Sequence, residues 1–276
     1  MDLKKSISVL GCGWLGFPLA KLLVSRGYSV NGSTTTADKL QKFAEAKIVP
    51  YLVQFNSEIP PENLSKFLQT DILVIAIPPG RKNQVKNNSF RNMATLVSKA
   101  VSGSSIIKII FISSTSVYGD INTTIDEYTS PSPENASGEL LLEVERMFSQ
   151  IANVQVSILR LSGLIGPDRH PARFFAGKEN IPNGLAPINL IHLDDVIGII
   201  LKLIEEEDTP GIFIGSCPDH PVKEKFYTWA AQHKNLPTPT FRNELLNWKI
   251  IDGEQTARNL NYNYVHTDLM KWISES

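Results

Sequence analysis

The chain has 276 residues, and 27 Lys and Arg stand against 28 Asp and Glu, so its formal net charge is −1. Hydrophobic residues make up 42% and charged residues 20%, which is the balance of a soluble globular enzyme. This balance excludes a disordered tail and a collagen-like chain, and we expect neither nucleic acid nor a membrane as a partner. The two cysteines, Cys12 and Cys217, are too few for a disulfide framework and lack metal-ligand spacing, which indicates a reducing, cytoplasmic setting without a metal site.

The N-terminal segment has the charge and apolar character of a secretory signal, but a different interpretation explains it better. Residues 1–5 include two lysines, and residues 7–23 are largely apolar. Three glycines interrupt the apolar run, and no small-x-small cleavage site follows it. A strand, a glycine turn and a helix account for the same residues. No other segment reaches the roughly 18 apolar residues that a bilayer crossing needs.

The first half of the chain alternates short apolar runs with helix-like segments. Continuous apolar strands separated by helices are typical of a parallel sheet that is covered on both faces. We therefore predict an α/β fold with a doubly wound parallel Rossmann sheet. The predicted strands are 6–10, 28–32, 48–53, 72–77 and 106–112, and the predicted helices are 17–26, 38–46 and 88–102.

The second half is less regular. An amphipathic helix is predicted at 139–151 and a sixth strand at 154–161. Two further helices are predicted at 194–206 and 223–233, and a short apolar run lies between them at 212–214. We predict an NAD(P)-binding Rossmann domain over 1–161 with parts of 185–215. The segments 162–184 and 216–276 then form a smaller substrate lobe.

A glycine motif directly follows the first strand. Gly11, Gly13 and Gly16 have the G-x-G-x-x-G spacing and open the first helix, with Trp14 and Leu15 inside the loop. The first glycine permits a tight turn, the second lets a pyrophosphate approach the backbone, and the third allows close packing of helix on strand. The helix N-terminus then attracts the phosphates. The alternative is a tight turn that binds no ligand. Cys12 is interpreted as a small filler residue.

The end of the second strand bears on the choice between NAD and NADP. An NAD-preferring fold usually has Asp or Glu there, bonded to the ribose 2′-hydroxyl. This chain has Ser33, Thr34 and Thr35 instead, with Lys39 further on. Hydroxyl and N–H groups tolerate a 2′-phosphate, which favours NADP over NAD slightly. Alternatively, residues 34–36 only cap the next helix.

Three segments in order resemble the extended short-chain dehydrogenases/reductases, the family that includes NAD-dependent epimerases and dehydratases. They are Phe111–Asp120, Leu159–Pro167 and Asn189–Val196. The resemblance implies a Rossmann domain that binds NAD(P) and a small C-terminal substrate lobe. It also places Ser114 at the catalytic serine or threonine. The turn after the fourth strand, which in similar proteins lies along the cofactor, corresponds to Ala76, Ile77, Pro78 and Pro79.

The chain departs from this family at its catalytic dyad, Tyr-x-x-x-Lys. Alignment of the apolar stripe puts Asn135 at the tyrosine and Glu139 at the lysine, to within about one residue. Asn does not exchange a proton usefully, and Glu reverses the supporting charge. The chain therefore resembles an atypical branch of the family. Tyr128 and then Tyr118 are the candidates to replace the catalytic acid.

Other polar residues of the motifs allow two interpretations each. His192 is interpreted as a structural hydrogen-bonding residue rather than a catalytic one, and Asp194 and Asp195 as the cap of the following helix. Arg169 and Arg173, with His170 between them, face either a substrate phosphate or carboxylate or only solvent.

Two functions remain open on the sequence alone. The first is an epimerase-, dehydratase- or reductase-like protein that acts on a small polar substrate, including nucleotide-linked ones, as a monomer or homodimer. The second is a non-catalytic NAD(P)-binding sensor.

Overall fold

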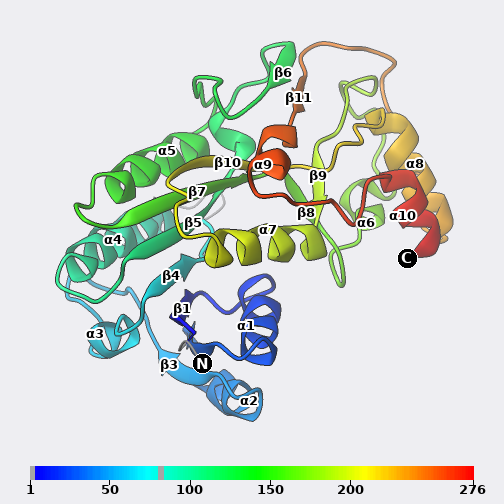
Figure 1. Cartoon of the computed structure of the whole chain (residues 1–276). Helices are drawn as coiled ribbons and strands as arrows, with labels where there is room; N and C mark the ends of the chain where they lie inside the picture. Colours follow the sequence, from blue (N-terminus) through cyan, green and yellow to red (C-terminus); the bar gives the residue numbers. More distant parts are fainter. Residues whose placement is uncertain (1–3, 80–83) are drawn as a thin grey trace. The chain divides into compact units, whose positions relative to one another are not determined.

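The computed structural model describes residues 4–79 and 84–276, and its central feature is a seven-stranded sheet (Figure 1). The strand order is β10-β7-β5-β4-β1-β2-β3. The pairings β3–β2, β2–β1, β1–β4 and β4–β5 are all parallel, with Val9 opposite Gly32 and Val74. The predicted doubly wound sheet is therefore confirmed. The strands are β1 (Ser6–Leu10), β2 (Ser29–Thr34), β3 (Val49–Leu52), β4 (Ile72–Ile75), β5 (Lys108–Ser114), β7 (Gln155–Leu161) and β10 (Gly211–Gly215).

The helices between the strands follow the predicted ones to within a few residues. They form because apolar side chains recur every three or four positions, as in α5, where Leu140, Leu141, Val144 and Phe148 are buried. The helical segments are α1 (Gly16–Ser25), the 3₁₀ turn η1 (Ala37–Lys39), α2 (Leu40–Glu45), α3 (Leu64–Phe67), α4 (Gln84–Val101), α5 (Ala136–Ser149) and α7 (Leu193–Glu205). The short helix α3 is not predicted from the sequence.

The chain divides into two compact units. The first contains residues 1–114, 135–159 and 203–212, and the second contains 115–134, 160–202 and 213–276. Segment 115–134, assigned to the Rossmann domain on sequence grounds, lies in the second unit because its strand β6 (Thr123–Ile125) pairs with β11 (Lys249–Ile251).

The second unit contains one helix with the bounds predicted from the sequence, α8 (Lys223–His233), and several shorter elements that leave little trace in the sequence. Strand β8 (Gly163–Ile165) pairs in parallel with β9 (Leu190–His192). The helical segments are the 3₁₀ turn η2 (Thr115–Val117), α6 (Ala172–Phe175), α8 (Lys223–His233), α9 (Glu254–Asn259) and α10 (Leu269–Glu275). Helices α6, α8 and α10 lie together around a core that includes Phe226, Leu269 and Ile273 (Figure 1). Within the described residues, no helix combines the length and the apolar character that a membrane crossing requires.

Candidate functional site

The glycine loop has the geometry that each of its three glycines predicts. Gly11 has φ +99°, and a Cβ atom there would lie 2.8 Å from Ile77 Cγ1 and 3.1 Å from the Ala76 carbonyl oxygen. A Cβ atom on Gly16 would overlap the Gly11 carbonyl group. At Gly13, by contrast, no atom of the described residues lies within 4 Å of the added Cβ, apart from the glycine and its two chain neighbours. The loop is therefore closed against the protein at its first and third glycines and open at the second, where the motif admits a pyrophosphate.

Strand β2 holds this loop in place through Ser33. The hydroxyl of Ser33 accepts a hydrogen bond from Gly11 N at 2.8 Å, and its carbonyl oxygen accepts one from Cys12 N at 3.0 Å. Ser33 is only 3% exposed. The Thr34 hydroxyl is also used internally, because it accepts the N–H of Thr36 at 3.1 Å. Of the three predicted ribose-side residues, Thr35 is the exposed one.

The end of β4 lies directly against the glycine loop. Ala76 N donates a hydrogen bond to Leu10 O at 2.9 Å, which continues the β1–β4 pairing beyond the strand. Pro78 is exposed and Pro79 half-buried, and the continuation of this turn, from Gly80, lies outside the described residues. The structure thus brings together the glycine loop, the end of β2 and the end of β4, as in other Rossmann folds.

Ser114 is the last residue of β5, the strand next to β4, and it is half-buried. Its neighbour Ser113 points the other way, as alternation along a strand requires. The Ser113 hydroxyl donates a 2.5 Å hydrogen bond to Oε1 of Glu145, a carboxyl group on α5 that is almost completely buried. The sequence analysis does not identify Glu145, because nothing in the pattern of this amphipathic helix distinguishes a buried glutamate from an exposed one.

Helix α5 shows what the residues at the dyad positions do. Asn135 precedes the helix in an extended conformation, and its side chain accepts the N–H of Gly138 at 3.0 Å. It is thus an N-cap residue. Glu139 is exposed in the first turn, where a negative charge is favourable to the helix dipole. The helix itself, Ala136–Ser149, contains neither tyrosine nor lysine.

The two tyrosines that are candidates for the catalytic acid have opposite environments. Tyr118 is 2% exposed, and its hydroxyl accepts a 2.6 Å hydrogen bond from the buried guanidinium of Arg160. The same hydroxyl donates to the carbonyl oxygen of Asp126 at 3.4 Å. Tyr128 lies in the turn that follows and is 80% exposed. Tyr118 therefore belongs to the interior of the second unit, whereas the Tyr128 hydroxyl is accessible.

A basic cavity of about 520 Å³ lies in the second unit. Arg173, Lys234 and His170 line it, together with Trp272, whose ring stacks on His170 at 5.4 Å. Burial and the charges of Lys234, His233 and Arg173 lower the pKa of His170 to about 4. Arg169 lies in the turn just before this segment, where its N–H donates to the carbonyl oxygen of Gly166. Of the two predicted substrate residues, the structure places Arg173 on the cavity wall.

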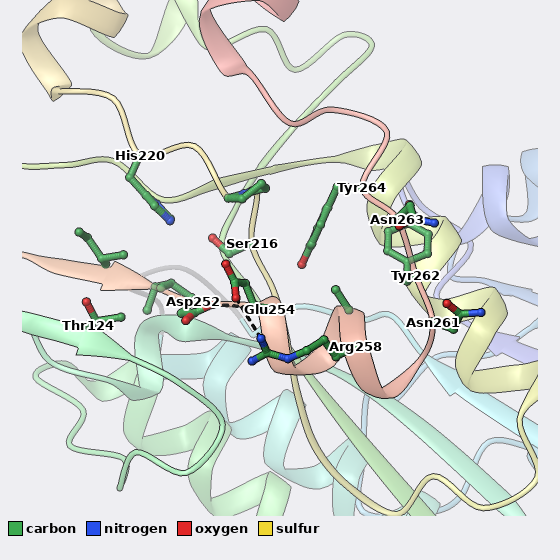
Figure 2. A pocket seen from close by; sticks show the side chains of 15 residues that line it. Thr124, Ser216, His220, Asp252, Glu254, Arg258, Asn261, Tyr262, Asn263 and Tyr264 are labelled. Atoms are coloured by element: carbon green, nitrogen blue, oxygen red, sulfur yellow. Dashed lines mark hydrogen bonds and ion pairs between the residues drawn. The ribbon is translucent and has the colours of Figure 1, made fainter.

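A second cavity in the same unit, of about 700 Å³, has a mixed polar lining (Figure 2). It lies between the segment after β10, strand β11, helix α9 and the segment 261–264. Arg258 and Glu254, both on α9, form an ion pair at 3.2 Å. Figure 2 marks this pair, which compensates the positive charge of Arg258 locally. Burial raises the pKa of Tyr264, a phenol of the same lining, above its ordinary value. No motif in the sequence predicts this cavity.

The head of α7 carries a cluster that joins residues far apart in the chain. Asp195 is completely buried and accepts hydrogen bonds from Tyr262 Oη at 2.8 Å and from the backbone N–H of Val265 and His266 at 2.6 and 3.2 Å. This pins the segment 262–266 to α7, and it places His266 beside His192, with ring centroids 3.8 Å apart. Asp195 thus lies in the first turn of α7, as predicted, and it also holds the segment 262–266 against this helix.

Both cysteines are free and buried. Desolvation raises the pKa of Cys12 to about 12 and that of Cys217 to about 12, so both are protonated thiols at neutral pH. This agrees with the interpretation of Cys12 as a filler residue.

Comparison with known proteins agrees with this architecture. Residues 6–123 match the family described as the NAD binding domain of 6-phosphogluconate dehydrogenase. Among solved structures, MoeE5 in complex with UDP-glucose and NAD has a TM-score of 0.81 at 17% identity, covering 98% of this chain and 96% of that one. UDP-glucuronic acid 4-epimerase from Bacillus cereus, in complex with UDP-glucuronic acid and NAD, has a TM-score of 0.80 at 18% identity, covering 97% and 96%. These likenesses establish the fold as that of NAD-dependent epimerases and dehydratases.

A further relative is far more similar in sequence. Protein YeeZ of Escherichia coli is 39% identical over 268 residues, which are 96% of this chain and 97% of YeeZ. The chain, whose N-terminal part is a Rossmann domain of the NAD-binding type, therefore belongs to the family of YeeZ.

Proposed function

We propose that the protein binds NAD(P) at the glycine loop and acts on a small polar substrate with an anionic group, in the manner of an epimerase, dehydratase or reductase. The proposal of NAD(P) binding is supported by the open space beside Gly13, which contrasts with the close contacts at Gly11 and Gly16. In this motif the pyrophosphate of the cofactor lies against the backbone at the second glycine, so a side chain is not tolerated there. A bound nicotinamide supplies hydride transfer, and the protein supplies binding and orientation.

The substrate class follows from the basic cavity. Arg173 and Lys234 provide two positive charges on its wall, where Asp168 also lies, and the Lys234 ammonium donates to the Ser276 carbonyl oxygen at 2.7 Å. Burial is the main cause that lowers the pKa of His170, and the neighbouring positive charges add to it. A phosphate or carboxylate group compensates such charges, and the guanidinium can bind it with two hydrogen bonds. Nucleotide-linked sugars are within this class.

A non-catalytic dinucleotide sensor is the second candidate, and helix α5 favours it. A helix without tyrosine and lysine lacks the ordinary proton donor of the fold. If the protein is an enzyme, we infer that a different group transfers the proton, with Ser114 orienting the substrate oxygen.

Cofactor binding is tested by titrating the protein with NADPH and NADH by calorimetry. Gly13→Asp puts an anion where the pyrophosphate is expected, so binding should fall by at least about a hundredfold, while Gly13→Ala should lose much less. Both variants should fold, because the space beside Gly13 is open. Equal affinity of Gly13→Asp and the wild type would remove the assignment of this loop.

The substrate class is tested separately with UDP-glucose and UDP-glucuronic acid in the presence of cofactor. Arg173→Ala should weaken binding by about tenfold or more, since a charge-assisted hydrogen bond contributes about 1.5–3 kcal/mol. Arg258→Ala is the matched control, because that arginine lines the other cavity and is paired with Glu254. Equal losses in both variants, or a loss only in the control, would contradict the assignment.

A further inference from the structure

We propose that Tyr227 and Lys223, on α8, bind an oxyanion group of a small ligand, which is a phosphate or a carboxylate. Both residues line a third cavity of the second unit, of about 240 Å³, which shares no residue with the lining of the two cavities described above. They are four positions apart on α8, so their side chains lie on one face of the helix. A cavity of this size accommodates a small ligand or one group of a larger one.

The ring of Tyr227 is held by other aromatic residues, and its hydroxyl has no partner in the protein. Tyr227 is 7% exposed, and its ring packs edge to face against Phe175 and Phe226, with centroids 4.6 and 5.2 Å away. The hydroxyl forms no hydrogen bond with any residue that the structure describes. Its oxygen is nevertheless accessible, unlike that of Tyr264, which is enclosed. A buried phenol is costly unless its hydroxyl finds an acceptor, and here that acceptor has to come from the cavity.

Lys223 adds a positive charge to the same cavity. Its ammonium donates to the carbonyl oxygen of Pro182 at 3.2 Å and lies 5.6 Å from the centroid of the Phe175 ring. Burial lowers the pKa of Lys223, and the charge of Asp120 raises it by a smaller amount. A partly desolvated ammonium of this kind is stabilised by an anion that comes close to it.

The other charges of the cavity compensate each other. Lys249 Nζ lies 3.0 Å from Asp120 Oδ1 and donates to the carbonyl oxygen of Tyr118 at 2.6 Å. Asp120 is thus paired with Lys249 rather than with Lys223. The charge of Lys223 therefore remains to be compensated, which favours an anionic ligand over a cationic one.

The two groups offer different hydrogen bonds to an oxyanion. Burial raises the pKa of Tyr227 to about 12, so the phenol keeps its proton at neutral pH and can donate it in a hydrogen bond. The ammonium of Lys223 supplies a charge-assisted hydrogen bond, which is the stronger of the two. The wall beside them is already fixed, because Asn189 donates to the carbonyl oxygen of Lys249 at 2.9 Å and accepts the N–H of Ile251 at 2.8 Å.

The site is tested by NMR on protein labelled with carbon-13 at the ε positions of tyrosine, titrated with inorganic phosphate. The chain has 7 tyrosines, and the signal that Tyr227→Phe removes belongs to Tyr227. We expect this signal to shift and saturate with a millimolar dissociation constant, because so small an anion makes few contacts. Lys223→Met should raise the constant by at least about tenfold. Lys225→Met, at an exposed position of the same helix, is the matched control and should leave it unchanged.

Melting temperatures without phosphate show whether the variants are folded. Tyr227→Phe should melt as the wild type does, because its hydroxyl has no partner in the protein to lose. It remains informative even if Lys223→Met does not fold. In an Arg173→Ala background, which removes the arginine of the basic cavity, phosphate should raise the melting temperature less when Tyr227→Phe is added.

Three results would overturn the proposal. One is a Tyr227 signal that does not saturate with phosphate, or that shifts equally with sodium chloride of the same ionic strength. Another is a folded Lys223→Met protein that binds phosphate as tightly as the wild type. The third is an equal rise in melting temperature with and without the Tyr227 hydroxyl. Arg173→Ala alone should keep the phosphate shift of Tyr227, so failure at this site and failure at the basic cavity are distinguishable.

Discussion

Thr35 is the residue at which the cofactor preference of the protein can be tested most directly. Counting from the glycine motif places Ser33 at the ribose, but the structure shows that the Ser33 hydroxyl anchors Gly11 in a buried position. A carboxylate introduced at Ser33 would therefore disturb the loop as well as the ribose contact. Thr35 is exposed, and the last residues of β2 contain no carboxylate, so NADP(H) should bind at least as tightly as NAD(H).

Thr35→Asp should shift this preference toward NADH. The new charge repels a 2′-phosphate and can accept a hydrogen bond from a 2′-hydroxyl, and a tenfold change corresponds to only about 1.4 kcal/mol. Thr35→Asn, which has the same shape without the charge, is the control. The measurement is the ratio of the NADPH and NADH dissociation constants. A native ratio that favours NADH by more than about tenfold would show that another group binds the ribose.

At the scale of an element, α7 contains a glycine that its tertiary contacts require. Gly198 lies in the middle of the helix, where glycine costs about 1 kcal/mol relative to alanine. A Cβ atom there would lie 2.5 Å from Tyr262 Oη and 2.6 Å from Tyr262 Cε2. The space is thus occupied by the ring whose hydroxyl donates to Asp195.

Gly198→Ala should therefore destabilise the protein by about 1–3 kcal/mol in spite of the better helix propensity. Gly103→Ala is the matched control, because a Cβ there would meet no atom of the described residues within 4 Å beyond its own local backbone, and its effect should stay within about 0.5 kcal/mol. Urea unfolding measures both. In a Tyr262→Ala background the cost of Gly198→Ala should largely disappear, and an unchanged cost would show that the strain has another source.

At the scale of the whole molecule, the source of a catalytic proton has to be sought among several elements, because no single element contains the Tyr-x-x-x-Lys dyad. A positioned acid or base contributes about 10²–10⁴ in rate. We expect little or no turnover of nucleotide-sugar epimerase and dehydratase substrates by the native protein. Any activity found should depend on Tyr128 first, since its hydroxyl is accessible, and on Tyr118 second, since that hydroxyl is bonded to Arg160.

A substrate screen on the wild type, Ser114→Ala, Tyr128→Phe and Tyr118→Phe checks this expectation. Tyr128→Phe should lower any observed rate by about a hundredfold and leave the melting temperature unchanged. Tyr118→Phe should lower the melting temperature, because it leaves a buried guanidinium with one partner fewer. Robust turnover that survives both tyrosine changes would show that the acid lies elsewhere.

The sequence by itself determined the parts of this protein whose physics is local. Strand-forming apolar runs, the G-x-G-x-x-G spacing of one tight turn and the apolar stripes of the helices act over a few residues, so the sheet class, the loop and most helix positions follow from them. The tertiary structure alone decided the pairing of β6 with β11 and the meeting of His192 and Asp194 with His266, about 70 residues away. Such contacts depend on how buried groups such as Asp195 satisfy their hydrogen bonds, and residues that meet only through folding leave no periodic pattern along the chain.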